Sequence, residues 1–207
     1  MDFQIEKRLV QEFYKSIEMS NPQNIPSVLK KYCSETLIWR GFHPFNMIRG
    51  PEEVGKKFWY PLLKSLKKCQ RREDIFFAGF NEIKGHEGVW VLSMGHLMGL
   101  FDESWLGIPA SEKLTMLRYC EFNKIKEGKI IETAMFFDIP HLMSQTGIKP
   151  FVYQTAAHLV QPGPKTHDGL LFNNQDHKEG KRTLNIIESM VNDVKDWLNF
   201  DHKSLKK

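Results

Sequence analysis

The sequence predicts an α+β domain in which several helices come first and a curved antiparallel sheet follows. Up to Leu66, apolar residues recur mainly at helical spacing, with one short extended stretch between the helices. From Arg72 to Asp138, long segments rich in aromatic and β-branched residues are separated by short turns, as in an antiparallel meander. Helices that pack on one face of such a sheet form a cone with a cavity between the two layers. We therefore expect this architecture for residues 1–150.

Three helices are predicted in the first third of the chain. Apolar residues recur on one face of the stretch from Phe3 to Met19. Asn21 is suited to cap a second, shorter helix, because the proline Pro22 follows it at a position that favours the first helical turn. A third helix is predicted from about Pro51 to Leu66, with its aromatic and leucine side chains facing inward.

Strands and turns account for most of the next segment. Residues 34–46 predict a strand followed by a turn-rich stretch. Residues 72–101 predict two strands joined at Lys84–Gly85, and residues 113–138 predict two more, joined by a tight turn at Glu127–Gly128. The loop between these two pairs contains the stretch DESWLGIPAS.

The last quarter of the chain differs in character from the first domain. Beyond Gly147, clusters of Pro, Gly, Asn and Asp predict a linker or extended arm. An amphipathic helix then follows from about Lys181 to Phe200, and its apolar face must pack on the first domain or on a partner chain. We therefore divide the chain into an α+β domain, residues 1–150, and a second segment, residues 151–207.

Composition and charge exclude several classes of protein. The net charge is only +4 and evenly spread, so no basic footprint for nucleic acid is expected. The densest basic stretch, from Lys64 to Arg72, is followed at once by two acids and predicts a solvated helix end. No apolar run approaches the roughly 20 residues that cross a bilayer, so no membrane partner is expected. The 3 cysteines are widely spaced, which indicates a reducing, cytoplasmic setting.

Asp138 stands out because it ends the apolar strand that contains Phe136 and Phe137. Asp followed by Ile139 and Pro140 is a good N-cap for a short helix, so a capping role is one interpretation. The other is a carboxylate at the mouth of a pocket that acts as a general base. Both roles are compatible only if one oxygen caps the helix while the other faces the cavity.

Alternation along the strands brings further polar residues to notice. In the last strand, every second residue from Ile130 to Asp138, including Phe136, is expected on one face. His96 shares its face with five apolar neighbours, which fits either a core histidine or an apolar pocket. Arg118 lies on a mostly apolar face as well and needs an acidic partner or an anionic ligand.

Aromatic residues raise the same choice between core and pocket. Trp39 and Trp59 are expected either to fill the core or to line a cavity, and core filling is the simpler interpretation of each. His43 precedes a proline in a loop, where burial is less automatic. The eight histidines are not spaced as metal ligands on any single element, so no metal is expected.

Several motifs in succession resemble the SnoaL-like polyketide cyclase family, of the nuclear-transport-factor-two-like (cystatin-like) α+β cone class. They cover most of residues 1–150 in the family's order. The motifs are WRGFHP from Trp39, RGPEEV from Arg49, FWYPL from Phe58, GHLMGLF from Gly95, WLGIPA from Trp105, EGKIIE from Glu127 and FDIPHLMSQTG from Phe137. The stretch from Pro162 to Met190 resembles the lead-in to a second module of the same type, which here stops after its first helix.

The resemblance implies a cofactor-independent enzyme that closes a ring on a polyketide-like ester by intramolecular aldol condensation. Asp138 would be the base that removes an α-proton, and His96 would polarise or protonate a carbonyl oxygen. The partners implied are a small apolar or polyketide-like ligand and a second copy of the chain. The candidate substrate-binding residues are Trp39, His43, Trp59, Trp105, Arg118 and Phe136.

Other functions of the same fold stay open. The chain could be a non-catalytic module that binds a small apolar ligand or dimerises through its sheet. It could also be a hydrolase, dehydratase or isomerase that uses the same pocket, because this scaffold hosts many activities.

Overall fold

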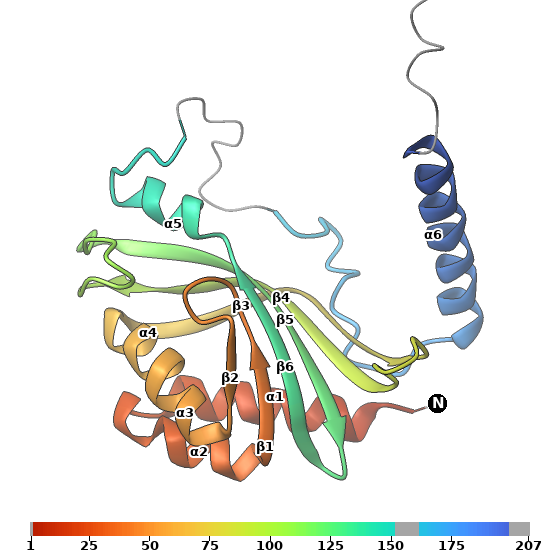
Figure 1. The fold of residues 1–207 in the computed structure, drawn as a ribbon, viewed down its shortest axis with the longest axis horizontal. Coiled ribbons are helices and arrows are strands. Elements are labelled where there is room, and N and C mark those ends of the chain that lie inside the picture. The colour runs from red at the N-terminus through yellow and green to blue at the C-terminus, as the bar shows by residue number, and fades with distance from the viewer. Residues whose placement is uncertain (1, 152–161, 199–207) are drawn as a thin grey trace, which may run out of the picture. The chain divides into compact units, whose positions relative to one another are not determined.

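The computed structural model describes residues 2–151 and 162–198. It has the predicted α+β order, with helices before the long strands (Figure 1). The helices are α1 (Gln4–Met19), η1 (Pro22–Asn24), α2 (Ile25–Tyr32), α3 (Pro51–Val54), η2 (Gly55–Trp59), α4 (Tyr60–Ser65), α5 (Ile139–Gln145) and α6 (His177–Leu198). The strands are β1 (Cys33–Arg40), β2 (Met47–Arg49), β3 (Leu66–Asn81), β4 (Gly88–Phe101), β5 (Leu114–Lys126) and β6 (Lys129–Phe137).

The strands form one curved sheet in the order β2-β1-β6-β5-β4-β3. Strands β3 to β6 are the predicted antiparallel meander. Strand β1, however, runs parallel to β6, so the sheet is mixed rather than purely antiparallel. The helical stretch that follows β2 carries the chain across the sheet, and this crossover leaves β1 beside the last strand instead of beside β3.

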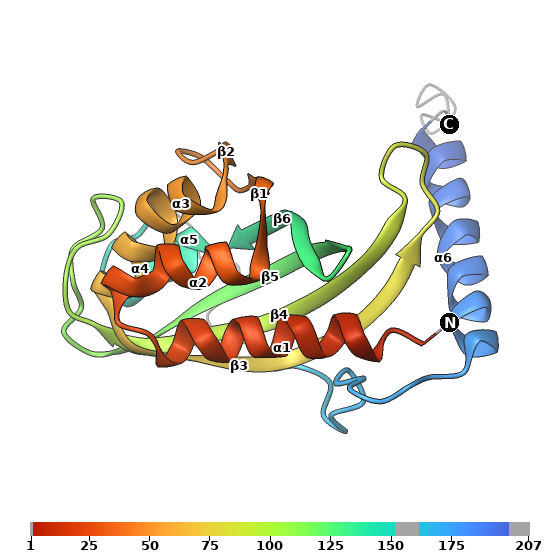
Figure 2. The same ribbon diagram turned by 90° about the horizontal axis from the view of Figure 1, so that it is seen from below.

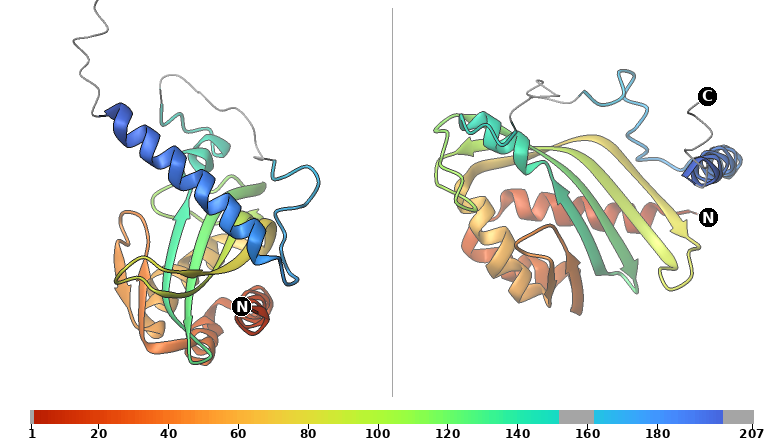
Figure 3. Two further views of the ribbon diagram at one scale, coloured as in Figure 1. Left: turned by 90° about the vertical axis from the view of Figure 1, so that its right-hand side faces the viewer. Right: turned by 45° about the horizontal axis from the view of Figure 1, so that its top comes forward.

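Helices α1 to α4 cover one face of this sheet, which we call the inner face (Figure 2). Helix α1 runs along β3 and β4 (Figure 2). Helix α5 lies on the other side of the sheet, the outer face, next to β5 (Figure 3). Gln145 fixes this position, because its side chain hydrogen bonds to both the N–H and the C=O of Met116 at 2.9 and 2.7 Å. These bonds replace the strand partner that β5 loses where β6 ends.

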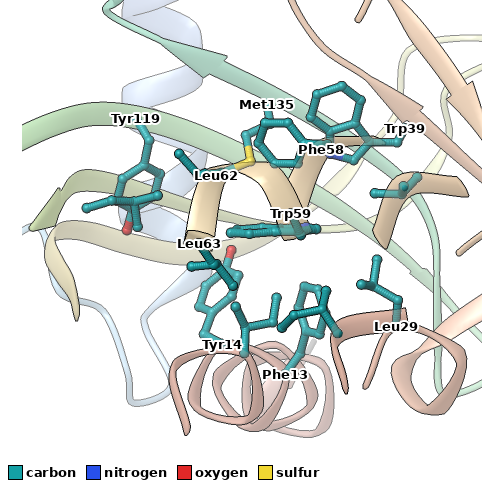
Figure 4. Packing of buried hydrophobic residues seen from close by; sticks show 14 of the residues in the cluster. Phe13, Tyr14, Leu29, Trp39, Phe58, Trp59, Leu62, Leu63, Tyr119 and Met135 are labelled. Carbon is teal, nitrogen blue, oxygen red and sulfur yellow. The ribbon is translucent and has the colours of Figure 1, made fainter. Parts of the chain in front are cut away.

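Side chains from both layers meet in a continuous core (Figure 4). Phe13 and Tyr14 of α1 point toward Trp59, and Trp59 lies below Met135 of the sheet (Figure 4). The predicted third helix is present as α3, η2 and α4 in unbroken succession. Its middle, η2, is a π-helical turn that ends at the buried Trp59.

The basic stretch near Arg71 is not a solvated helix end, as the sequence suggested. It belongs to β3, and the Arg71 side chain is only 5% exposed. Alternation along β3 turns Arg71 to the inner face, where it lies opposite Leu97 of β4. The prediction of a solvated helix end was therefore wrong, because the burial of Arg71 depends on partners from other elements.

The chain divides into two compact units, Asp2–Asn173 and Asn174–Lys207. The first unit extends beyond residue 150 because residues 164–173 pack against β3 and α1. The second contains α6, whose exposed apolar residues include Leu184, Ile187 and Val191. The predicted end of this helix at Phe200 lies outside the described residues. Among the described residues, no helix combines the length and the apolar character needed to cross a bilayer.

Candidate functional site

The predicted site residues lie on both faces of the sheet. His96 of β4 lies directly opposite Arg118 of β5, and Phe136 of β6 lies opposite Cys120 two residues further along β5. This places His96, Arg118 and Phe136 together on the outer face. The expected face of β6 is partly wrong, because a bulge before Glu132 turns Ile130 to the inner face, where it is fully buried.

Asp138 caps helix α5, as one interpretation of the sequence proposed. Its Oδ1 accepts a hydrogen bond from the N–H of His141 at 3.0 Å. Its own N–H donates to the carbonyl of Arg118 at 3.1 Å, which continues the β5–β6 ladder by one residue. The cap uses one carboxylate oxygen, and no described residue donates a hydrogen bond to Oδ2.

His96 has a different acid beside it. Its Nδ1 lies 3.5 Å from Oδ2 of Asp74, and its side chain is only 3% exposed. Burial lowers the pKa of His96. The nearby Arg118 and His141 lower this pKa further, and Asp74 opposes their effect. His96 and Asp138 belong to strands separated by β5, so their backbones are roughly 10 Å apart. Arg118 of β5 lies between the two predicted catalytic residues.

The predicted tryptophans lie on the inner face, where Trp39 and Trp105 belong to a cluster that we call the aromatic box. Each ring packs on its neighbours, with centroid separations from 4.4 Å (Trp39–Phe58) to 6.5 Å (Phe42–Trp105). Figure 4 shows Trp39 against Phe58. The members of the box are Trp39, Phe42, Phe45, Phe58, Trp105 and Phe137.

Two loops contribute half of the aromatic box. Phe42 and Phe45 come from the β1–β2 loop, and Trp105 comes from the β4–β5 loop. Trp105 is held by paired backbone hydrogen bonds with Ile108, of 3.1 and 2.9 Å, around the turn Leu106–Gly107. Both turn residues have positive φ, which explains the glycine in the WLGIPA stretch.

The box holds two indole N–H groups without an acceptor. Trp39 is 1% exposed and Trp105 is 3% exposed, yet no described residue accepts a hydrogen bond from either Nε1. Buried polar groups are almost always paired, and indole N–H groups usually find a partner when they are buried. These two donors are therefore candidates for a hydrogen bond to an oxygen of a ligand.

The other two aromatic candidates differ in environment. Trp59 is buried, and its ring centroid lies 5.1 Å from that of Phe58, so it packs against a member of the box. His43 is exposed in the β1–β2 loop. Beside this loop lies an open hollow of about 450 Å³. Its wall includes Phe45 of the box and the charged residues Arg49, Glu53 and Lys57, of which Glu53 and Lys57 form an ion pair at 2.9 Å.

A buried polar network also lies on the inner face, and sequence reasoning did not find it. Nη2 of Arg71 lies 2.8 Å from Oε2 of Glu121, and the guanidinium stacks on the rings of Tyr14 and Tyr119 at 3.6 and 4.4 Å. Asn123 donates to Glu121 and to the hydroxyl of Tyr14 at 3.2 and 2.9 Å. Glu121 is therefore held by a hydrogen bond from Asn123, and Arg71 is held by stacking on the two tyrosine rings.

Glu73 extends this network along β3. Its Oε1 accepts a hydrogen bond from Ser93 at 2.7 Å, and the Ser93 hydroxyl lies 2.7 Å from the hydroxyl of Tyr119. Burial raises the pKa of Glu73, against the opposing effects of Ser93 and Arg71. Burial also raises the pKa of Tyr119 to about 12. The alternating polar residues of β5 were a usable signal, because they share one face with residues that must be buried.

A second hollow, of about 460 Å³, lies on the outer face. Most of its wall is aromatic or aliphatic, and Phe136 is one of its lining residues. Within the part of the chain that the structure describes, no group of three or more His, Cys, Asp or Glu side chains is placed to hold a metal ion.

The fold can be compared with known proteins. No protein-family profile matches the sequence, and no curated protein matches it. Solved structures do match in three dimensions. A protein from Jannaschia sp. CCS1, provisionally assigned as a SnoaL-like polyketide cyclase, gives a TM-score of 0.54 at 15% identity, over 72% of this chain and 95% of that one. The chain has the SnoaL-like fold.

Two further solved structures agree with this assignment. IdmH from Streptomyces antibioticus, provisionally a polyketide cyclase, gives a TM-score of 0.51 at 11% identity, over 68% of this chain and 97% of that one. A provisionally assigned polyketide cyclase from Xanthomonas campestris gives 0.52 at 14% identity, over 69% and 97%. At such identities the likeness concerns the SnoaL-like fold and not the chemistry.

Proposed function

We propose that the protein is a cofactor-independent acid–base enzyme that acts on a carbonyl compound such as a polyketide-like ester. The observation that carries the proposal is the pair of unpaired indole donors, Trp39 and Trp105, inside the aromatic box. Phe137 is part of this box, and Asp138, with one oxygen uncommitted, follows it on the opposite face at the end of β6, so a substrate would meet Asp138 past the end of the strand. A donor pair, an apolar cage and a carboxylate are what the chemistry of an enolate needs.

The reaction would proceed by proton transfer at Asp138. Its Oδ2 takes a proton from the carbon next to a carbonyl, and the C–H electrons become the enolate. The enolate carbon then forms a bond to a second carbonyl carbon of the same molecule, and that oxygen becomes an alkoxide. The alkoxide takes the proton back from Asp138, so nothing else is consumed. The indole N–H groups of Trp39 and Trp105 stabilise the negative oxygen.

The proposal changes one expectation from the sequence. The family resemblance gives the role of polarising the carbonyl to His96, but His96 lies on the outer face within β4 and not, like Asp138, at the end of a strand beside the box. We therefore assign that role to Trp39 and Trp105. Substrate would enter from the hollow of about 450 Å³, because Phe45 is shared by the hollow and the box. Arg49 would attract a negatively charged substrate group there.

The test compares Asp138→Asn with the wild-type protein. Asn keeps an oxygen that can accept from the N–H of His141, so the unfolding free energy should change by less than about 1 kcal/mol. The amide cannot take a proton, so exchange of the α-protons of a β-keto ester in D₂O, followed by NMR, should slow by about 100-fold or more relative to wild type. Lys15→Ala, at an exposed position of α1, is the control. Exchange at the wild-type rate in Asp138→Asn would refute the role.

A second candidate function is supported by the outer hollow. Its apolar wall and volume of about 460 Å³ suit a small apolar ligand, and Phe136 there is 52% exposed. In this reading the protein binds without catalysis. Titration with an apolar fluorescent probe should then show binding that Phe136→Ser weakens and Asp138→Asn leaves intact. Equal binding by Phe136→Ser and wild type would exclude this site.

The homodimer and the cytoplasmic location expected from the sequence stay predictions. The exposed aromatic side chains of the outer face, such as Phe77, Phe80 and Phe136, support self-association. Light scattering during gel filtration would measure the mass. A mass equal to the 24.3 kDa chain at micromolar concentration would exclude a stable homodimer.

A further inference from the structure

Residues 164–173 lie along the free edge of the sheet, and we call this segment the edge strap. Strand β3 is the last strand of the sheet, so the backbone groups along its free edge have no partner in a neighbouring strand. The N–H of Phe76 donates to the carbonyl of Gly169 at 2.7 Å, and the N–H of Leu171 donates to the carbonyl of Phe76 at 2.7 Å. The edge strap therefore adds a parallel bridge to β3 at Leu170.

A lysine from the opposite end of the sequence holds the edge strap in place. Nζ of Lys7 donates to the carbonyls of Leu171 and Asn173 at 2.6 and 3.0 Å. Lys7 belongs to α1 and is only 5% exposed, and burial lowers its pKa. The ring of Phe172 packs on Phe76 at 5.3 Å. A buried ammonium group with two carbonyl acceptors joins α1 to the edge strap.

The edge strap and the glycine before it also pack on Asp74. A Cβ atom placed at Gly163 would come within 2.5 Å of Cβ of Asp74, and one at Gly169 would come within 2.7 Å of the Asp74 carbonyl oxygen. Only glycine allows so close an approach. Because Asp74 is the acid beside His96, this contact connects the strap to the buried histidine of the outer face.

We propose that the edge strap is a detachable cover over the β3 edge and the Asp74–His96 pair, and that Lys7 is the latch that keeps it closed. Lys165 to Asp168 of the strap are exposed, so it can open while the sheet stays intact. Opening uncovers the backbone of Phe76 and exposes Asp74, the acid beside His96, more fully than its present 31%. The proposal concerns the outer face and does not depend on Asp138 or the aromatic box.

The latch is tested by hydrogen exchange on the full chain. Lys7→Met removes the two hydrogen bonds and keeps an apolar stem of similar length. We expect the amides of Phe76 and Leu171 to exchange at least 10-fold faster, with those of β5 and β6 unchanged. Trypsin should also cut faster after the exposed Lys165. Lys7→Arg should restore part of the protection, because a guanidinium also donates hydrogen bonds.

Two controls keep this test decisive. Lys15→Met makes the same change at an exposed position of α1 and should leave both amides at the wild-type rate. Gly169→Ala leaves Lys7 in place but pushes the strap off the Asp74 carbonyl, so it should give the same local increase in exchange. Unchanged exchange at Phe76 and Leu171 in Lys7→Met and Gly169→Ala would overturn the proposal. An equal increase throughout β5 and β6 would do so too, because the strap would then be inseparable from the fold.

Discussion

Glu73 and Asp74 are consecutive residues of β3, and their carboxylates therefore lie on opposite faces of the sheet. Glu73 accepts a hydrogen bond from Ser93 on the inner face, and Asp74 lies beside His96 on the outer face. A bulge also lies at this point, because Glu73 lies opposite Gly95 and the next paired residue of β3 is Ile75. Asp74 is the extra residue. One strand thereby supplies an acid to each face.

Gly95 is predicted to be indispensable at this bulge. A Cβ atom there would lie 1.9 Å from the carbonyl oxygen of Arg72, which is backbone and cannot move aside. Gly95→Ala should therefore lower the free energy of unfolding by about 3 kcal/mol or more, measured by urea denaturation. Gly79→Ala is the matched control in β3, because nothing lies within 4 Å of its Cβ position. A loss in Gly79→Ala as large as that in Gly95→Ala would contradict the steric explanation.

The buried ion pair of Arg71 and Glu121 gives the second prediction. Glu121→Leu leaves the guanidinium uncompensated in the core and should cost about 3–5 kcal/mol of stability. Removing both charges in Arg71→Met/Glu121→Leu should cost clearly less than the sum of the two single changes. Urea denaturation of the four proteins measures the coupling. Additive losses would mean that the 2.8 Å contact carries no coupling between the two residues.

Elements set by local sequence were predicted well. The turn Glu127–Gly128 is where the sequence placed it, because two-residue hairpin turns need residues that tolerate positive φ. The helix from Gln4 to Met19 follows from a single apolar face. The parallel pairing of β1 with β6 was missed, because it joins strands about a hundred residues apart and depends on where the helices cross the sheet.

The candidate site was harder to predict, because both faces of β4 and β5 carry apolar residues. Alternation correctly grouped His96 with its neighbours, but it does not say which face the helices cover. The inner face instead holds Ser93, Tyr119 and Glu121, whose burial is possible only with Arg71 as a partner. Trp39 and Trp105 were identified as candidates, but their unpaired N–H groups appear only in the packed core.

The third prediction concerns pH. Because the pKa of His96 is lowered in the folded state, chiefly by burial, the folded protein holds the imidazole neutral. The unfolded chain binds a proton below about pH 6.5, so stability falls as the pH drops through this value towards the lowered pKa. Urea denaturation of wild type and His96→Gln from pH 7.5 to 5.5 should show the steeper loss in wild type.

The difference between these two proteins isolates the histidine. Glu73 makes the folded protein more stable as the pH falls, which is opposite to the effect of His96. The reason is that the pKa of Glu73 is raised in the folded state, which favours its neutral form. Arg118, His141 and Asp74 face His96 and are present in both proteins. Parallel stability curves for wild type and His96→Gln would show that His96 does not titrate in this range.

The last prediction is a stabilising change in the β5–β6 turn. Glu127 and Gly128 have φ angles of 52° and 70°, as a two-residue turn of this hand requires. Glu127 bears the steric cost of a side chain in the left-handed region, whereas asparagine is tolerated there more readily. Its ion pair with Lys126 is long, at 3.8 Å, and exposed, so its loss matters little. Glu127→Asn should raise the free energy of unfolding by about 0.5 kcal/mol, and Gly128→Ala should lower it by about 1 kcal/mol. Urea denaturation checks both signs, and a loss in Glu127→Asn would show that the turn adopts another conformation in solution.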